Sequence, residues 1–347
     1  MKIHLYTVPL KKRFPLAISR GVRSHSENVF LAYEHEGFVG WGEAAPGASE
    51  GAATPAEVKA ELGRFLATDF EQLSIADCQQ RSIDMQIAPC AYAAFDIALW
   101  DWKAKKAQMP LYELLGFSAP NNPTSVTLGI NTPEVVKERI PLLLDGTTVK
   151  SLKIKLGSPK GIEADKAMFE QVLESTEPYS VGLRVDANGG WNVEEAITMM
   201  DWLSSRGVTY VEQPLAEGQE EALTKLQGHL PIFLDESCRF AKNIPQWAQH
   251  VYGVNIKLMK CGGITEALNI MATAKAFGLK TMIGCMSESS VSIAAGAALS
   301  SAIDHIDLDS HYNLNPDPAS DAPMVNGITM PPVVPGHGAT LNREYYA

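Results

Sequence analysis

The sequence lacks the features with which proteins bind nucleic acids or membranes. Of its 347 residues, 40 are Asp or Glu and 29 are Lys or Arg, so the formal net charge is −11, and no cluster of basic residues occurs. Nucleic-acid binders and proteins that dock on anionic membranes need such a basic surface. No run of about 18 apolar residues offers a membrane span. We therefore expect no nucleic acid and no membrane as partner, and the sequence leaves open whether the chain forms a homo-oligomer.

Cysteine is also scarce, with five residues that lie far apart and form no CxxC pair. An odd number at such spacing indicates neither a disulfide framework nor a zinc cluster. The initial segment MKIHLYTVPLKKRFPLAIS carries charges and prolines where a signal peptide has an apolar core. A cytoplasmic location is therefore expected. With 46% hydrophobic residues, the chain can bury a sizeable core.

Residues 1–120 have the pattern of an α+β domain. Two β-prone runs flank the turn Glu36-Gly37, and two later stretches have helical spacing. The predicted strands are Val29–Tyr33 and Phe38–Gly42, and the predicted helices are Pro55–Leu66 and Ala88–Ala107.

From residue 121 to about 310, short β-prone runs alternate with helix-like stretches. Where successive runs end on charged residues, those ends are 22 to 31 residues apart, which suits a strand, a helix and two loops. Eight such units predict an α/β fold, a parallel barrel with its chemistry at the C-terminal strand ends. An open doubly wound sheet is the alternative, but no G-x-G-x-x-G supports it. The runs are Ser125–Leu128, Leu152–Lys155, Gly182–Asp186, Tyr210–Glu212, Ile232–Asp235, Val254–Lys257, Thr281–Ile283 and Ile306–Asp309.

Three consecutive runs end in carboxylates: Asp186 in RVDANGGW, Glu212 in VEQPL and Asp235 in LDES. On adjacent barrel strands they would converge, and close carboxylates need a cation or a proton to coexist. An all-oxygen set suits Mg2+ rather than zinc. The alternative is that each acid caps the helix that follows it. We predict a Mg2+ site.

Lysines stand at the ends of the second and sixth strands. Lys153 and Lys155 alternate with apolar residues, so both are expected to face the barrel interior. Burial and neighbouring positive charge would lower the pKa of a lysine, as a general base requires. Lys257 ends the sixth strand, whereas Lys260, one turn later, is expected to be a solvated surface residue. Because strands two and six lie opposite each other, Lys155 and Lys257 would flank a metal-bound substrate, as inversion at a carbon centre requires.

Six motifs in order resemble the enolase superfamily, muconate-lactonizing-enzyme subgroup. They are KIK (153–155), DANGGW (186–191), EQPL (212–215), DES (235–237), NIKLMKCGG (255–263) and GCMSES (284–289). The resemblance implies a modified (β/α)7β TIM-type barrel, residues 121–310, under an α+β capping domain, residues 1–120. Residues 311–347 would return toward the cap. Loops near residues 15–27 and 45–54 would close over the substrate.

The eighth run, HIDLDS, places Asp307 and Asp309 on one face. An acidic pair opposite the metal would bind a cationic group at the far end of a substrate whose carboxylate is bound to the metal. A dipeptide has both groups, a C-terminal carboxylate and an α-ammonium. This Asp-x-Asp resembles the dipeptide epimerases, of which L-Ala-D/L-Glu epimerase is the best known. A structural pair that caps the strand end is the alternative.

The resemblance implies further site residues. Thr127 and Lys153 would contact substrate, and Cys285, Met286 and Ser287 would line the side-chain pocket. Asn188 and Glu236 would orient the metal ligands and lysines. Arg20 or Arg23 could pair with a glutamyl carboxylate, although a surface arginine is an equal interpretation.

The sequence thus predicts an isomerase, a dipeptide epimerase that transfers the α-proton of the second residue with Mg2+, Lys155 and Lys257, with L-Ala-D/L-Glu as the first candidate substrate. Sibling activities on the same scaffold are the alternative: o-succinylbenzoate synthase, N-succinylamino acid racemase or muconate cycloisomerase. Their substrates lack the free ammonium that would explain Asp307 and Asp309. A non-catalytic metal-dependent binding protein is the remote alternative.

Overall fold

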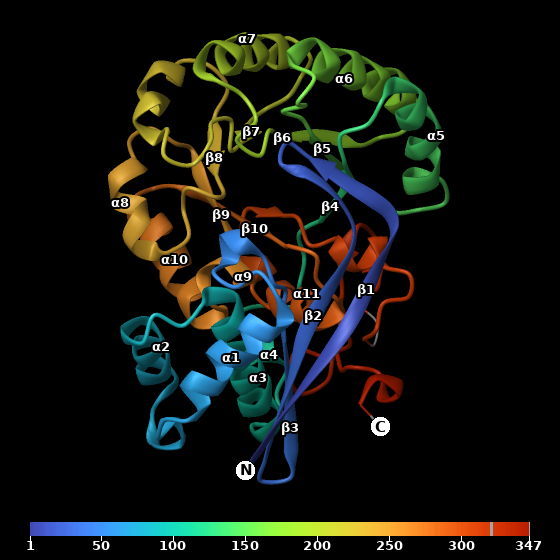
Figure 1. Cartoon of the computed structure of the whole chain (residues 1–347). Coiled ribbons are helices and arrows are strands. Elements are labelled where there is room, and N and C mark those ends of the chain that lie inside the picture. Colours follow the sequence, from blue (N-terminus) through green and yellow to red (C-terminus); the bar gives the residue numbers. More distant parts are fainter. Residues whose placement is uncertain (320–321, 347) are drawn as a thin grey trace.

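The N-terminal part of the chain is an antiparallel sheet with helices packed on one face (Figure 1). The computed structural model describes residues 1–319 and 322–346. The sheet has the order β1-β2-β3, and the turn between β2 and β3 places Glu36 at φ 48° and Gly37 at φ 81°, as the sequence predicts for this turn. Its strands are β1 (Lys2–Ile18), β2 (Gly21–His35) and β3 (Phe38–Ala44), and its helices are α1 (Pro55–Leu66), α2 (Ile75–Asp84), α3 (Pro89–Lys106) and α4 (Leu111–Leu114).

Strands β1 and β2 form a long ribbon whose tip reaches the barrel strands β5 and β6 (Figure 1). The pairing is continuous from Lys2 to Lys11, shifts register between Lys11 and Leu16, and resumes to Ile18. The expectation of a loop over residues 15–27 is therefore wrong, because these residues pair as the end of a two-stranded ribbon. Residues 45–54 do form a connection, with one short 3₁₀ helix at Ala48–Glu50.

Helix α3 lies directly on the sheet because β3 carries glycines beneath it. A Cβ at Gly40 would stand 2.0 Å from the carbonyl oxygen of Ala98, and one at Gly42 would stand 2.0 Å from that of Ala94. Any side chain at either position would push the helix away. The small residues of α3 thus complement the glycines of β3, and nearly every face of the helix is buried.

The second unit is a parallel barrel, with strand order β4-β5-β6-β7-β8-β9-β10-β11. A parallel bridge between Thr124 and Ile306 joins the first strand to the last. This arrangement confirms the predicted barrel with its α+β cap. The strands are β4 (Ser125–Leu128), β5 (Ser151–Lys155), β6 (Gly182–Asp186), β7 (Val211–Glu212), β8 (Ile232–Leu234), β9 (Gly253–Lys257), β10 (Lys280–Gly284) and β11 (His305–Ile306).

Helices surround the barrel on the outside (Figure 1). A 3₁₀ helix, Glu220–Leu226, stands between β7 and β8. Among the described residues, no helix is long and apolar enough to cross a membrane. The α-helices of this unit are α5 (Pro133–Leu144), α6 (Ile162–Thr176), α7 (Val193–Ser204), α8 (Ile244–Trp247), α9 (Leu258–Cys261), α10 (Ile264–Ala276) and α11 (Ser290–Ala297).

The C-terminal segment runs back to the cap. His337 is buried, and its ring lies 2.9 Å from the carbonyl oxygen of Trp41 in β3. Leu314 and Leu341 join a hydrophobic cluster with residues of the cap sheet and of α11. A small two-stranded sheet, β12 (Met324–Val325) and β13 (Ile328–Thr329), lies within the segment. Residues 320, 321 and 347 of the predicted return segment lie outside the described residues, and the boundaries at residues 120 and 310 stay predictions.

Candidate active site

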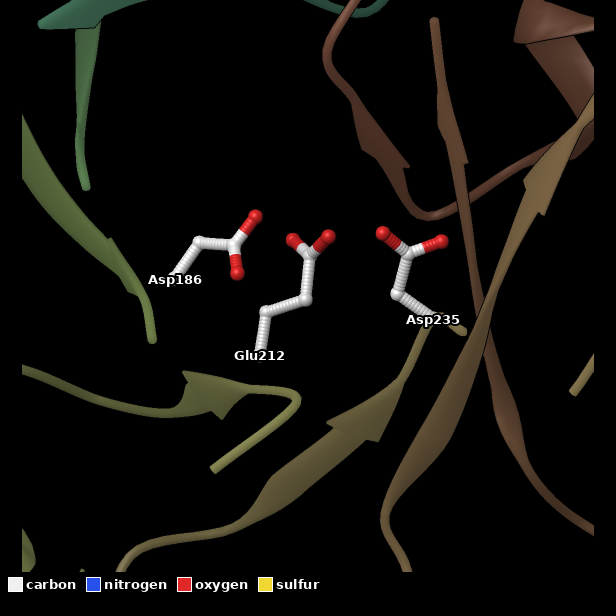
Figure 2. Close-up of side chains that lie close together, drawn as sticks. All are labelled: Asp186, Glu212 and Asp235. Carbon is white, nitrogen blue, oxygen red and sulfur yellow. The ribbon is translucent and has the colours of Figure 1, made fainter. Parts of the chain in front are cut away.

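Three carboxylates meet at the C-terminal ends of adjacent strands (Figure 2). Asp186 ends β6, Glu212 ends β7 and Asp235 follows β8. One oxygen from each side chain lies within 4.8 Å of the others, and all three residues are at most 1% exposed. Burial, and then Asp186, raises the pKa of Glu212 to about 8. A buried cluster of oxygen donors at this spacing fits a divalent cation such as Mg2+.

The two lysines of β5 point into this cluster, as predicted. The Lys155 ammonium lies 2.6 Å from Asp186 Oδ2. The Lys153 ammonium lies 2.8 Å from Glu212 Oε2 and 2.6 Å from Asp307 Oδ2, so it joins the carboxylate cluster to the acidic residues of the last strand. Both lysines are less than 10% exposed.

Two further lysines hold Asp235, one at each oxygen. Lys257 lies 2.5 Å from Oδ2 and Lys260 lies 2.9 Å from Oδ1. Lys260 also donates to the carbonyl oxygens of Asp235 and Asn255. The expectation that Lys260 is a surface residue is wrong, since it is 3% exposed. The short helix α9 turns it back toward the strand ends.

Neighbouring carboxylates raise the pKa of Lys153 and of Lys257, opposite to the lowering that the sequence predicts for a general base. Burial, the largest single influence, lowers the pKa of Lys257, but the negative charges of Asp235, Glu236 and Glu212 together raise it above its usual value. Burial also opposes the charge on Lys153, yet Asp307 and the carboxylate cluster raise the pKa of that lysine. The prediction considered burial and like charge only, whereas the contacts are with carboxylates.

Asn255 and Gln213 hold the carboxylate cluster and were missed in the sequence. Asn255 Nδ2 donates to Glu212 Oε1 at 2.8 Å. The side-chain oxygen of Gln213 accepts from the backbone nitrogens of Asp235 and Ser237. Asn255 stands two residues before Lys257 on β9, so strand alternation was a signal that could have placed it inside the barrel.

Asn188 and Glu236 lie beside the carboxylates. Asn188 donates its backbone nitrogen to Asp186 Oδ1 at 2.8 Å, and its amide nitrogen lies 3.3 Å from Asp186 Oδ2 and from Glu236 Oε1. Arg20, at the tip of the ribbon, donates to Glu236 Oε1 at 2.6 Å and to the carbonyl oxygen of Asn188 at 2.7 Å. Arg20 is therefore already paired with a carboxylate of the chain itself.

The two acids of the eighth run lie after the strand rather than within it. Strand β11 ends at Ile306, so the predicted strand through Asp309 is too long. Asp307 is bound to Lys153 and accepts from the Ser125 hydroxyl at 2.6 Å. Asp309 accepts from the backbone nitrogen of Thr127 at 2.6 Å. The pair is thus unequal, because one acid is already paired with a lysine.

A cavity of about 230 Å3 opens above the carboxylate cluster, between the ribbon tip and the barrel. Both Lys155 and Lys257 line it, together with apolar side chains of the ribbon and the loop after β10. The other lining residues are Leu16, Ile18, Arg20, Gly21, Val22, Arg23, Ser49, Asn188, Cys285, Met286 and Ser287.

Both units of the chain match descriptions of one enzyme family. Residues 2–116 match "Mandelate racemase / muconate lactonizing enzyme, N-terminal domain", and residues 136–345 match "Enolase C-terminal domain-like". The chain belongs to the mandelate racemase/muconate lactonizing enzyme family of the enolase superfamily. The predicted resemblance is confirmed.

Relatives within the family carry the names of dipeptide epimerases. A Flavobacteria bacterium protein named hydrophobic dipeptide epimerase is 66% identical, covering 100% of both chains. One of the same name from Roseobacter litoralis is 56% identical over 99% of this chain and 100% of its own. The crystal structure of a dipeptide epimerase from Enterococcus faecalis, complexed with Mg and L-Leu-L-Tyr, has a TM-score of 0.86. It is 31% identical, covering 98% of this chain and 99% of its own.

Proposed function

We propose that this enzyme is a dipeptide epimerase in which Lys155 and Lys257 exchange the α-proton of the second residue. The observation that carries the proposal is that both ammonium groups line one cavity beside three converging carboxylates. One lysine removes the proton from one face of the α-carbon, and the other returns a proton to the opposite face. The names of the relatives at 66% and 56% identity support this activity.

Asp186, Glu212 and Asp235 would hold Mg2+, the ion in the Enterococcus faecalis complex. Mg2+ supplies positive charge that stabilises the carboxylate end of the substrate as the α-carbon loses its proton. The chain's own residues orient this site, because Asn255 and Lys260 each hold one carboxylate in place. Lys153 adds a buried positive charge at the same end of the substrate.

Asp309 would bind the substrate α-ammonium. Lys153 and Ser125 already engage Asp307, whereas Asp309 accepts from the backbone nitrogen of Thr127. Burial, and then the charge of Asp307, raises the pKa of Asp309 to about 6. A substrate ammonium beside Asp309 would therefore stabilise its charged form. This geometry favours a dipeptide over the substrates of the sibling enzymes, which lack a free α-ammonium.

The cavity favours a hydrophobic side chain at the second position. Leu16, Ile18, Val22 and Met286 contribute apolar surface to it. A glutamyl carboxylate, as in L-Ala-D/L-Glu, would need a free arginine, and Arg20 is already bound to Glu236. The word "hydrophobic" in the names of the two most identical relatives quoted above agrees with this choice. L-Ala-D/L-Glu stays a prediction that depends on Arg23.

The test is deuterium incorporation. A panel of L,L- and L,D-dipeptides is incubated with enzyme and Mg2+ in D2O, and mass spectrometry follows the second α-carbon. Lys155→Ala and Lys257→Ala should each abolish epimerisation. Each variant keeps one of the two lysines, so any remaining exchange of the α-proton should be limited to one epimer of the dipeptide. The epimer that exchanges should differ between the two variants. Lys160→Ala, at an exposed lysine after β5, is the control. Epimerisation by either active-site variant would contradict the two-base scheme.

We also propose that the enzyme works in the cytoplasm. The five described cysteines are all free thiols, and four of them are buried. Unpaired thiols are usual in a reducing compartment.

A further inference from the structure

The cap reaches into the barrel through a buried carboxylate, Glu43 of β3. It accepts hydrogen bonds from Ser289, just before α11, from Ser292, in the first turn of α11, and from Asn28 of β2. The backbone nitrogen of Ser289 lies 3.0 Å from Glu43 Oε1 and 3.1 Å from Glu43 Oε2. The Ser289 hydroxyl lies 2.6 Å from Oε2, and the backbone nitrogen of Ser292 lies 3.3 Å from the same atom. Glu43, Asn28 and Ser289 are fully buried. The donors replace the water that a buried carboxylate loses.

Asn28 extends this contact to the wall of the cavity. Its Nδ2 atom lies 2.7 Å from Glu43 Oε1 and 2.7 Å from the carbonyl oxygen of Ser287. Ser287 lines the cavity beside Lys257, together with Cys285 and Met286. One amide group thus links the cap sheet to the loop on which the substrate side chain would rest.

A second contact of the same kind serves as an internal comparison. Asp96 of α3 accepts from the backbone nitrogen of Thr265 at 3.0 Å and from its hydroxyl at 2.5 Å, at the start of α10. It too is a buried cap carboxylate at the N-terminus of a barrel helix. Among the described residues that line the cavity, neither Asp96 nor Thr265 occurs. The two contacts therefore differ in whether they touch the cavity wall.

We propose that Asn28 and Glu43 are positioning residues that set the selectivity for the substrate side chain, by fixing the loop Cys285–Ser289 against the cap. The proposal rests on the epimerase function proposed above. A substrate side chain that filled the cavity would contact Cys285, Met286 and Ser287 of this loop, whereas a methyl group would leave most of the cavity unfilled. Loosening the loop therefore weakens binding of large side chains and leaves proton transfer by the lysines in place.

The test compares three dipeptides with the same first residue and Ala, Leu or Phe at the second position. We expect Asn28→Ala, which removes the hydrogen bonds to Glu43 and to the Ser287 carbonyl, to raise KM for the Leu and Phe substrates about tenfold. KM for the Ala substrate and kcat for all three should change less than about threefold. Glu43→Gln should shift selectivity in the same direction. The control, Asp96→Asn, should lower the melting temperature without changing the ratio of KM values.

Other outcomes would contradict either the proposed function or the positioning role of Asn28 and Glu43. If the wild-type enzyme exchanges none of the dipeptides, the proposed function fails. If it exchanges them and Asn28→Ala changes all three KM values equally, or Asp96→Asn shifts selectivity as much, the positioning proposal is overturned. Hydrogen exchange is measured on the wild-type enzyme, so this test does not depend on whether a variant folds. The amides of Met286 and Ser289 should be protected like those of α11, and exchange at the rate of an unstructured peptide would overturn the proposal.

Discussion

Removal of the Asn255 amide should weaken Mg2+ binding. Asn255 Nδ2 donates to Glu212 Oε1 at 2.8 Å inside the barrel. A hydrogen bond to a charged acceptor contributes about 1.5–3 kcal/mol, which corresponds to roughly tenfold to 150-fold in affinity. Lys153 still holds the other oxygen of Glu212 at 2.8 Å, so the carboxylate stays partly oriented. We therefore expect Asn255→Ala to raise the Kd for Mg2+ about tenfold.

Titration calorimetry with Mg2+, in the absence of dipeptide, measures this change directly. Asn121→Ala, at an exposed asparagine before β4, is the control and should leave the Kd unchanged. The circular dichroism spectrum establishes that each variant is folded. An unchanged Mg2+ affinity in folded Asn255→Ala would refute the argument that this amide positions a metal ligand.

Three further predictions concern the lysines, the substrate ammonium and pH. Lys260→Met should lower the free energy of unfolding by about 3 kcal/mol, measured in urea, because it leaves buried Asp235 with one lysine fewer; a loss below about 1 kcal/mol would contradict this. Asp309→Asn should raise KM for dipeptides about tenfold but leave N-acetyl dipeptides unaffected, and equal effects on both would exclude an ammonium contact. Burial, and then Arg184, lowers the pKa of His305 from 6.5 to about 4. The neutral imidazole therefore contributes fully to the stability of the fold above pH 6.5, and this contribution is lost as the pH falls toward 4. The melting temperature should thus rise between pH 4 and 6.5, and His305→Gln should flatten this rise.

Much of the barrel and of its carboxylate cluster could be predicted because the signals are local. Strand alternation places Lys153 and Lys155 on one face, and each of Asp186 and Glu212 closes a short β-prone run. Parallel strands bring such ends to one edge, so the positions along the chain sufficed to bring these side chains together.

Lys260 and the last strand could not be predicted in this way. Lys260 lies in α9, which packs against α3 of the cap, and that contact has no counterpart in local spacing. Pairing of β11 with β10 stops at Ile306, although the pattern HIDLDS continues to alternate.

The contact between Glu43 and Ser289 joins residues 246 positions apart. Neither residue stands in a pattern that points to the other. Long-range contacts of this kind depend on how the cap sits on the barrel, which periodicity does not describe.

The break in strand pairing between Lys11 and Leu16 has a consequence for how substrate reaches the cavity. Within the break the chain pairs with the C-terminal segment instead: the Asn313 side chain bonds to both backbone polar groups of Phe14, and Lys12 forms a bridge with Leu314. The distal end of the ribbon is bound to the barrel as well, because Ser19 and Arg20 donate to the carbonyl oxygen of Asn188. Any opening of the ribbon to admit substrate would have to break such contacts, so substitution of Asn313, well away from either amine, would alter the rate of substrate entry and product escape while the chemistry at the α-carbon stays the same.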